Sequence, residues 1–251
     1  MTTSPDLAAF VAGLPKAELH VHLQGAASVP TILELSRRYP DAGLPTEEDE
    51  LRELFRFRDF DHFLDVYMAV NQLVRTPDDV QSLVEGLGRD LAAVNIRYAE
   101  VTVTADSHLM AGMDPAGVAE ALSAGRAATL AMTGVELAYT YDINGAHGLA
   151  GAERTISWAE RFPAEGSVGF GLGGPEAGAP RTAYADAFRR ARDIGLASVP
   201  HAGETTGPQS IRDSLDALGA ARIGHGIAAA QDPTLMAELV ERDVVLEVCP
   251  T

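Results

Sequence analysis

Apolar runs with the composition of β-strands recur along this chain, and segments with helical periodicity lie between them. Alternating strands and helices are typical of βαβ units, which build parallel sheets. No glycine-rich phosphate-binding turn follows the first run, so seven strands in series favour a (β/α) barrel over a doubly wound sheet. The strand-like runs are residues 17–23, 96–104, 135–143, 167–172, 197–199 (leading into Pro200 and His201), 222–225 and 244–248. The helical segments are 78–93, 115–132, 153–161, 184–193, 211–218 and 233–242.

The composition narrows the classes of partner and compartment. A formal net charge of −17 over 251 residues argues against nucleic acid or an anionic membrane surface as the main partner. Cys249 is the only cysteine, so no internal disulfide can form and a reducing compartment is expected. The N-terminus lacks the pattern of a signal peptide, and no apolar run is long enough to span a membrane. We therefore expect a cytoplasmic protein that acts on a small molecule, and the sequence indicates no oligomeric state.

A long insert, residues 26–91, separates the first two strand-like runs. It contains an acidic segment at 47–50, which we expect to be exposed, and an aromatic segment at 55–67. Apolar side chains in this second segment have the spacing of one helical face, and such a stripe is most often core packing. The alternative is that the insert caps a barrel mouth and forms an apolar wall for a ring-shaped ligand. The residues of the stripe are Phe57, Phe60, Phe63, Leu64 and Tyr67.

Two histidines in the first run are candidate metal ligands. His20 and His22 are two residues apart on a strand, so their side chains point to the same face, about 6–7 Å apart along it. Neutral imidazole nitrogen is a favoured ligand of zinc. An isolated pair of this kind is equally compatible with a solvated strand face, so further ligands must come from other strands.

Histidine and glutamate recur at the ends of later strand-like runs, where barrel enzymes carry their functional groups. His201 and Glu204 follow the fifth run, and His225 lies between two glycines at the end of the sixth. A single buried histidine at either place is most often a core residue. Several strand ends that each carry such groups indicate a site instead.

These segments, taken together, are similar to the adenosine deaminase family of metal-dependent amidohydrolases. The resemblance extends in order and spacing from Leu14 to Thr251, almost the whole chain. It is carried by L-P-K-A-E-L-H-V-H-L at 14–23, G-L-G-G-P-E at 171–176, H-A-G-E at 201–204, R-I-G-H-G at 222–226 and L-E-V-C-P-T at 246–251.

The resemblance implies a (β/α)8 barrel that binds one zinc ion (Zn2+) and removes the 6-amino group of an adenine nucleoside by hydrolysis. It implies that His20, His22 and His201 bind the metal. It also implies that Glu204 protonates the purine N1 and that His225 orients the attacking water. The remaining substrate contacts are expected from His22, Gln24, Gly174, Phe60 and Leu64, with the Gly174 N–H near the purine N3. Zinc suits this chemistry because it lowers the pKa of bound water to about 7.

One departure from the family pattern concerns the end of the chain. The family carries a metal-binding Asp and a catalytic Asp after its eighth strand, whereas residue 251 ends what we count as the seventh. No other strand end offers an Asp-Asp pair, because Asp78 and Asp79 lie at an expected helix start. We interpret residues 1–251 as one C-terminally truncated barrel domain and do not expect activity from this stretch alone. An open barrel would leave apolar strand edges unpaired.

Two further departures concern the sugar side of the substrate. Gln24 stands where adenosine-specific members commonly carry Asp for the ribose 5′-hydroxyl. Residues 171–176 replace the family's D-L-A-G-D-E. Their form is similar to that of bacterial members that act on 6-aminodeoxyfutalosine, which has a bulky aromatic 5′ group. Adenosine and a 5′-modified adenosine both remain candidate substrates.

Two other functions are compatible with the sequence. An amidohydrolase acting on another C–N bond or on a phosphoester often uses two metals bridged by a carboxylated lysine, but Lys16 is the only lysine and precedes the first strand. Glu204, three residues after His201, favours protonation of a ring and hence deamination. The second possibility is a non-catalytic zinc-binding barrel or fragment.

Overall fold

The computed structural model describes residues 5–249, apart from the side chains of residues 5, 6, 60, 61 and 64. The chain divides into two compact units. Unit 1 comprises Met1–Val101 and Ala111–Ala138, and unit 2 comprises Thr102–Met110 and Tyr139–Thr251. The boundary passes through two strands, β2 (Ile96–Val103) and β3 (Glu136–Asn144), so each unit contains part of both.

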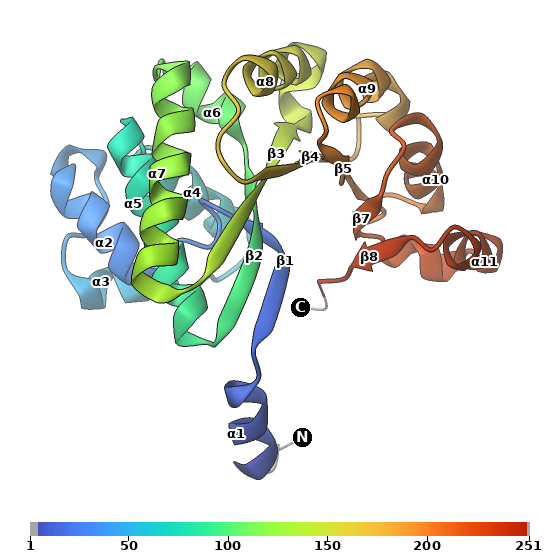
Figure 1. Cartoon of the computed structure of the whole chain (residues 1–251). Helices are drawn as coiled ribbons and strands as arrows, with labels where there is room; N and C mark the ends of the chain where they lie inside the picture. Colours follow the sequence, from blue (N-terminus) through green and yellow to red (C-terminus); the bar gives the residue numbers. More distant parts are fainter. Residues whose placement is uncertain (1–4, 250–251) are drawn as a thin grey trace. The chain divides into compact units, whose positions relative to one another are not determined.

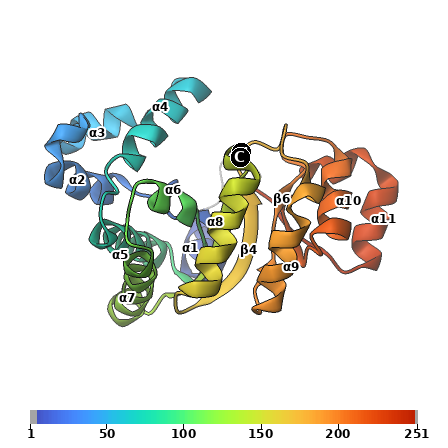
Figure 2. The ribbon, with the colours of Figure 1, turned by 90° about the horizontal axis from the view of Figure 1, so that it is seen from above.

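Unit 1 contains β1 (Lys16–His22), most of β2 and the start of β3, hydrogen-bonded in that order. Its two longest helices, α5 (Pro77–Ala93) and α7 (Pro115–Thr133), pack side by side (Figure 2). Their close approach depends on small residues, because a Cβ at Gly88 would lie 2.2 Å from the Thr129 side chain. The other helices of unit 1 are α1 (Pro5–Gly13), α2 (Val29–Arg38), the 3-10 helix η1 (Pro40–Ala42), α3 (Glu48–Leu54) and α4 (Phe60–Asn71) (Figure 1).

Unit 2 continues the alternation of strands and helices. β3 pairs in parallel with β4 (Ser167–Gly173), and β4 pairs with β5 (Ala197–Ser198). β6 (His201–Ala202), β7 (Arg222–His225) and β8 (Val245–Glu247) form a further parallel set in that order. The helices of this unit are α6 (Ala105–Met110), η2 (Gly145–His147), α8 (Gly148–Arg161), η3 (Arg181–Tyr184), α9 (Ala185–Asp193), α10 (Pro208–Ala217), η4 (Ile227–Gln231) and α11 (Pro233–Glu241) (Figure 1).

The expected strands and helices are present in the expected order, and the structure adds the helices α1, α2, α3 and α6. Lys16 does not precede the first strand but is the first residue of β1. The fifth expected strand is two short pieces, β5 and β6, separated by Val199 and Pro200. Proline has no N–H to donate to a strand neighbour, so the ladder is interrupted there. Asp78 and Asp79 lie in the first turn of α5, where Thr76 and Asp79 form a capping box, as expected for a helix start.

A compact apolar core supports β6, β7 and the helices that follow them. Ile211 from α10, Ile223 from β7 and Leu235 from α11 are fully buried in it. Their burial fixes the strand ends from which His201 and His225 project. The remaining members are Ala202, Leu215, Ala228, Ala229 and Leu239. Across residues 5–249, the longest helices are too short or too polar to cross a bilayer.

Candidate functional site

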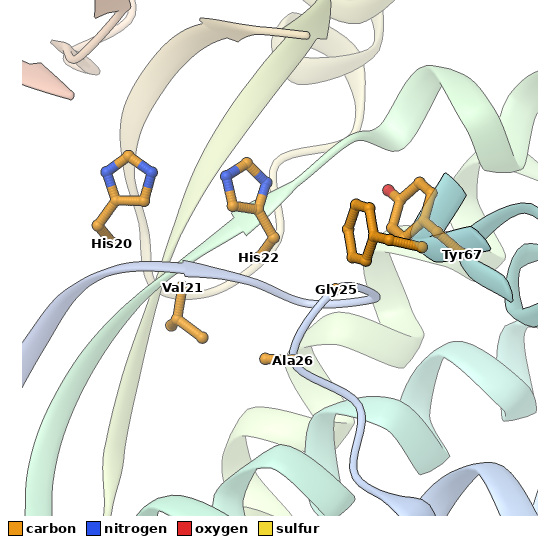
Figure 3. A pocket seen from close by; sticks show the side chains of 7 residues that line it. His20, Val21, His22, Gly25, Ala26 and Tyr67 are labelled. Carbon is orange, nitrogen blue, oxygen red and sulfur yellow. The ribbon is translucent and has the colours of Figure 1, made fainter. Parts of the chain in front are cut away.

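The two histidines of β1 project from the same side of the strand. Figure 3 shows the rings of His20 and His22 above β1 and Val21 on the opposite side. The ring centroids are 5.5 Å apart and the ring planes are tilted by 54°. The alternation of side chains along a strand therefore produces the juxtaposition expected from the sequence.

A pocket of about 420 Å³ opens beside these histidines within unit 1. Gly25, Ala26 and two aromatic rings of α4 also line it, and Figure 3 shows one of these rings, Tyr67, beside His22 and Gly25. These rings, Phe63 and Tyr67, are stacked with centroids 6.1 Å apart. The pocket thus combines two imidazoles with an aromatic wall.

A smaller hollow adjoins this pocket and contains Gln24. The Gln24 residue is only 8% exposed, and its neighbours in the hollow include Phe55, Phe57 and Phe63. Phe57 is 47% exposed, and its ring meets that of Phe63 in a T-shaped, edge-to-face contact with the centroids 5.3 Å apart. The aromatic stripe is therefore partly open to the hollow and is not simply buried core. The side chains of Phe60 and Leu64, also expected here, lie outside the described part of the chain.

In unit 2, two more histidines lie side by side. β6 and β7 are paired in register, with Ala202 opposite His225, and this places the His201 and His225 ring centroids 5.2 Å apart. His201 is 7% exposed. The parallel pairing of two strands thus brings together residues that are 24 positions apart in the sequence.

The carboxylate of Glu204 faces the ring of His225. Its Oε2 lies 3.4 Å from His225 Nε2, and the Glu204 side chain is 43% exposed. His225 has a φ of 64°, which is uncommon for a residue other than glycine. Backbone strain of this kind is often retained at functional sites, where it fixes the direction of a side chain.

A buried carboxylate, Glu176, holds the loop that carries Glu204. Its oxygens accept backbone N–H bonds from Gly203 at 2.7 Å, Thr205 at 2.6 Å and Thr206 at 3.0 Å. Desolvation by burial raises the pKa of Glu176, but these hydrogen bonds outweigh it and lower the pKa to about 2. Glu176 is therefore ionised at neutral pH.

Arg181 lies beside Glu176 and is equally buried. Its Nε donates to the His201 carbonyl at 3.1 Å, and a second nitrogen lies 3.6 Å from Glu176 Oε1. Burial lowers the pKa of Arg181 from its ordinary value, and the charge of Glu176 partly offsets that effect. Arg181 thus contacts the backbone at the start of the loop 201–206, and Glu176 contacts the backbone of its middle and end.

Asp142 on β3 is a third buried ionisable residue near this loop. It is 3% exposed, and its Oδ1 lies 4.0 Å from His201 Nδ1. Burial raises the pKa of Asp142 to about 8, although Arg181 opposes the shift. Glycines on β4 make room for this side chain, because a Cβ at Gly173 would lie 2.7 Å from Asp142 Oδ2.

Gly174 lies in the turn after β4 and is exposed. Its φ of 74° favours glycine, and a Cβ at this position would lie 2.8 Å from Asn144 Oδ1. The turn therefore leaves a backbone segment that a ligand can approach closely.

The histidines fit the chemistry of a zinc site. Each unit presents a pair of imidazole rings, His20 with His22 and His201 with His225. Imidazole nitrogen is a favoured zinc ligand, and a carboxylate close to a ligating histidine is a common second contact. Asp142 lies in such a position relative to His201.

Glu176, Arg181 and Asp142 were not expected at the site from the sequence. Glu176 belongs to the G-L-G-G-P-E motif, but nothing in the motif indicates which backbone groups it binds. The sequence does contain one indication of Asp142. It is an acidic residue within an apolar strand, and the next strand, 167–173, is rich in glycine. Such glycines mark places where a neighbouring chain segment approaches closely.

Comparison with known proteins identifies several relatives. A family model described as adenosine deaminase matches residues 15–251. Aminodeoxyfutalosine deaminase of Streptomyces avermitilis is 48% identical over 251 residues, which cover 99% of this chain and 70% of that protein. The enzyme of the same name from Streptomyces coelicolor is 49% identical over 248 residues, covering 98% and 64%. An adenine deaminase of Cupriavidus metallidurans is 33% identical over 260 residues, covering 100% and 70%. The chain thus spans about two thirds of the length of these relatives.

Two solved structures share the architecture. Adenine deaminase from Arthrobacter aurescens has a TM-score of 0.81 at 30% identity, covering 94% of this chain and 72% of that one. An amidohydrolase from Burkholderia ambifaria, crystallised with bound zinc, has a TM-score of 0.88 at 27% identity, covering 98% and 68%. Together with the parallel pairing of strands, these matches confirm the expected α/β class and the TIM-barrel fold of the metal-dependent hydrolases.

Proposed function

Because the chain belongs to the adenosine deaminase family, a family of enzymes, we propose that it catalyses zinc-dependent hydrolytic deamination of an adenine nucleoside. The 6-amino group leaves as ammonia, and the product is the inosine-type nucleoside. The observation that carries the proposal is the match over residues 15–251, within which the proposed acid Glu204 faces His225 at 3.4 Å. Named deaminases among the relatives support the reaction class.

We assign the metal to His20, His22 and His201, whose imidazole nitrogens suit one zinc ion. When bound, zinc supplies a hydroxide nucleophile near neutral pH by lowering the pKa of water to about 7. The zinc-bound amidohydrolase of Burkholderia ambifaria supports the choice of ion.

Glu204 is proposed to donate a proton to the purine N1. Addition of hydroxide to C6 breaks the C6–N1 double bond and places negative charge on N1, so a proton there lowers the barrier. General acid catalysis of this kind contributes about 10²- to 10⁴-fold. The partly exposed position of Glu204 supports the role, because its carboxyl group can reach a ligand.

His225 is proposed to orient the attacking water and accept its proton. Its ring lies close to both Glu204 and His201, the residues proposed to act on N1 and on the metal. The accepted proton can pass to the amino group, which then leaves from the tetrahedral C6 as ammonia.

Gly174 is proposed to donate its backbone N–H to the purine N3, and His22 to contact the substrate as well as the metal. The positive φ of Gly174 and the absence of a side chain support this close approach.

Among adenine nucleosides, the substrate is proposed to be a 5′-modified adenosine with an aromatic group, such as 6-aminodeoxyfutalosine. Identities of 48% and 49% to two aminodeoxyfutalosine deaminases support it. The rings of Phe63 and Tyr67, which line the pocket of about 420 Å³, offer apolar area for an aromatic 5′ group. Phe60 and Leu64 are also proposed to contact the substrate. We place the reaction in the cytoplasm, on a freely diffusing nucleoside.

Ammonia release from three substrates tests these assignments in the full-length protein. We expect turnover of 6-aminodeoxyfutalosine to exceed that of adenosine, and adenosine that of adenine. Preference for adenine would favour the activity named for the Cupriavidus metallidurans relative. Zinc binding without ammonia release would indicate the non-catalytic barrel, and release only from other amides would indicate another amidohydrolase.

The variant Glu204→Gln tests the mechanism. We expect turnover to fall about a thousandfold for every substrate, because the amide cannot protonate N1. The zinc content should stay unchanged, which distinguishes loss of the acid from loss of the metal. Near-normal turnover would remove Glu204 from the mechanism.

A further inference from the structure

The loop that carries Glu204 needs something to fix its position. Glu204 itself is 43% exposed, and a half-exposed side chain has considerable rotamer freedom. Gly203, directly before it, has a φ of 68°, and a Cβ there would lie 2.6 Å from the Ile211 side chain. The chain therefore makes a tight turn at the point where the proposed acid begins.

Glu176 contacts the backbone on both sides of Glu204. Its Oε1 accepts the N–H of Gly203, and its Oε2 accepts the N–H of Thr205 and of Thr206. Hydroxyl groups of Thr205 and Ser210 donate to the same carboxylate at 3.2 Å. One side chain thus restrains the residues immediately before and after the acid.

Arg181 adds a second restraint at the start of the loop. Its Nε holds the carbonyl of His201, while its guanidinium lies 3.6 Å from Glu176. Both side chains are 1% exposed. The pair therefore connects the peptide of a proposed metal ligand to the peptides around Glu204.

Stability alone is a weak reason for such an arrangement. A buried ion pair gains little over apolar residues of similar volume, because its desolvation cost is large. A carboxylate, however, offers only acceptor sites, so it can satisfy several converging N–H groups at once. An amide of the same shape would direct its own N–H groups at some of these donors.

We infer that Glu176, supported by Arg181, is a positioning residue for deamination: it fixes the peptides around Glu204 so that the acid reaches the purine N1. The inference rests on the proposed role of Glu204. Glu176 acts through Glu204 and does not contact the substrate.

A double-mutant cycle in the full-length protein tests the inference. We expect Glu176→Gln to lower kcat about a hundredfold, with KM changed less than about threefold, because misplacing a catalytic group mainly affects the transition state. Adding Glu176→Gln to Glu204→Gln should lower kcat less than about threefold further, since residues that act through one another are not additive. A further hundredfold loss in the double variant would show that Glu176 acts independently of Glu204 and would overturn the inference.

Asp79→Asn is the matched control. Asp79 is also a buried carboxylate that accepts backbone N–H bonds, from Arg75 at 3.0 Å and Thr76 at 2.9 Å, and it pairs with Arg38. It lies in α5 of unit 1, and none of these contacts involves a proposed site residue. We expect both variants to lower the melting temperature, but only Glu176→Gln to lower kcat. Equal kcat values in the two variants would reduce Glu176 to a structural role.

If Glu176→Gln does not fold, Ser210→Ala can take its place in the double-mutant cycle. The Ser210 hydroxyl donates to Glu176 and accepts from Gly203 N–H at 2.9 Å. We expect a fall in kcat of about fivefold in the wild-type background and none in the Glu204→Gln background. Equal falls in both would contradict the inference. If Glu204→Gln alone leaves kcat near normal, the proposed function fails instead, and the two failures are thus distinguishable.

Discussion

The hollow around Gln24 in unit 1 and the loop 201–206 in unit 2 are built by different forces. The hollow is lined by rings that contact one another, including Phe57 with Phe63, and the exposure of Phe57 is 47%. The loop is held by hydrogen bonds from backbone N–H groups to the buried Glu176. Apolar contacts are non-directional, whereas these hydrogen bonds demand a single geometry.

We expect this difference to separate recognition of the nucleoside from the chemistry of its deamination. An apolar wall made of partly exposed rings can accept different 5′ groups at modest cost. A buried carboxylate surrounded by donors tolerates little displacement, because each unsatisfied buried group costs about 1–3 kcal/mol. We therefore expect substitutions in the aromatic wall, such as at Phe63, to change which nucleoside is bound, and substitutions around the loop to change whether any nucleoside reacts.

The largest expected effect is that of His201→Ala in the full-length protein. Removing one of three proposed imidazole ligands should release most of the zinc and lower turnover by about a thousandfold or more for every substrate. Metal analysis and ammonia release measure the two effects. His62→Ala is the control for zinc content, because this histidine of α4 has no proposed role in metal binding; its Nδ1 accepts the Arg58 N–H at 3.3 Å and its ring lies against Phe57. Unchanged zinc content in His201→Ala would contradict the ligand assignment.

An intermediate effect is expected on stability in acid. The pKa of Glu176 is about 2 in the folded protein against an ordinary 4.5, so its contribution is complete above pH 4.5 and is lost as the pH falls toward 2. That difference corresponds to about 3 kcal/mol of the free energy of unfolding. Urea unfolding at several pH values should therefore show wild type and Glu176→Gln converging as the pH decreases. A constant difference between them would mean that the buried carboxylate does not restrain the loop in this way.

The smallest expected effect concerns the wall of the hollow. Phe63→Ala should raise KM for a 5′-aryl nucleoside about tenfold, while KM for adenosine changes less than about threefold, because only the aryl group loses an aromatic contact. Phe10→Ala, an exposed ring on α1, serves as a control for general effects of removing a phenyl group. Equal changes for both nucleosides would remove the distinction between recognition and chemistry.

Local patterns in the sequence predicted much of this architecture. Hydrophobic periodicity indicated the strands and the helices, and the alternation of side chains along β1 predicted that His20 and His22 share a face. These features depend on residues close together in the chain, so they can be read without the fold. The roles assigned to Glu204, His225, Gly174 and Gln24 came from the family resemblance, and they stay proposals.

The sequence by itself thus determined the strand and helix order and the kinds of side chain at the strand ends. Only the tertiary structure decided that Glu176 accepts the N–H of Gly203, 27 residues later, and that Arg181 is buried against His201. It also decided that the fifth strand is divided at Pro200 and that the aromatic stripe borders a hollow. The physical reason is that hydrogen bonds to buried charges join distant segments, and no local periodicity records which donors a carboxylate will meet.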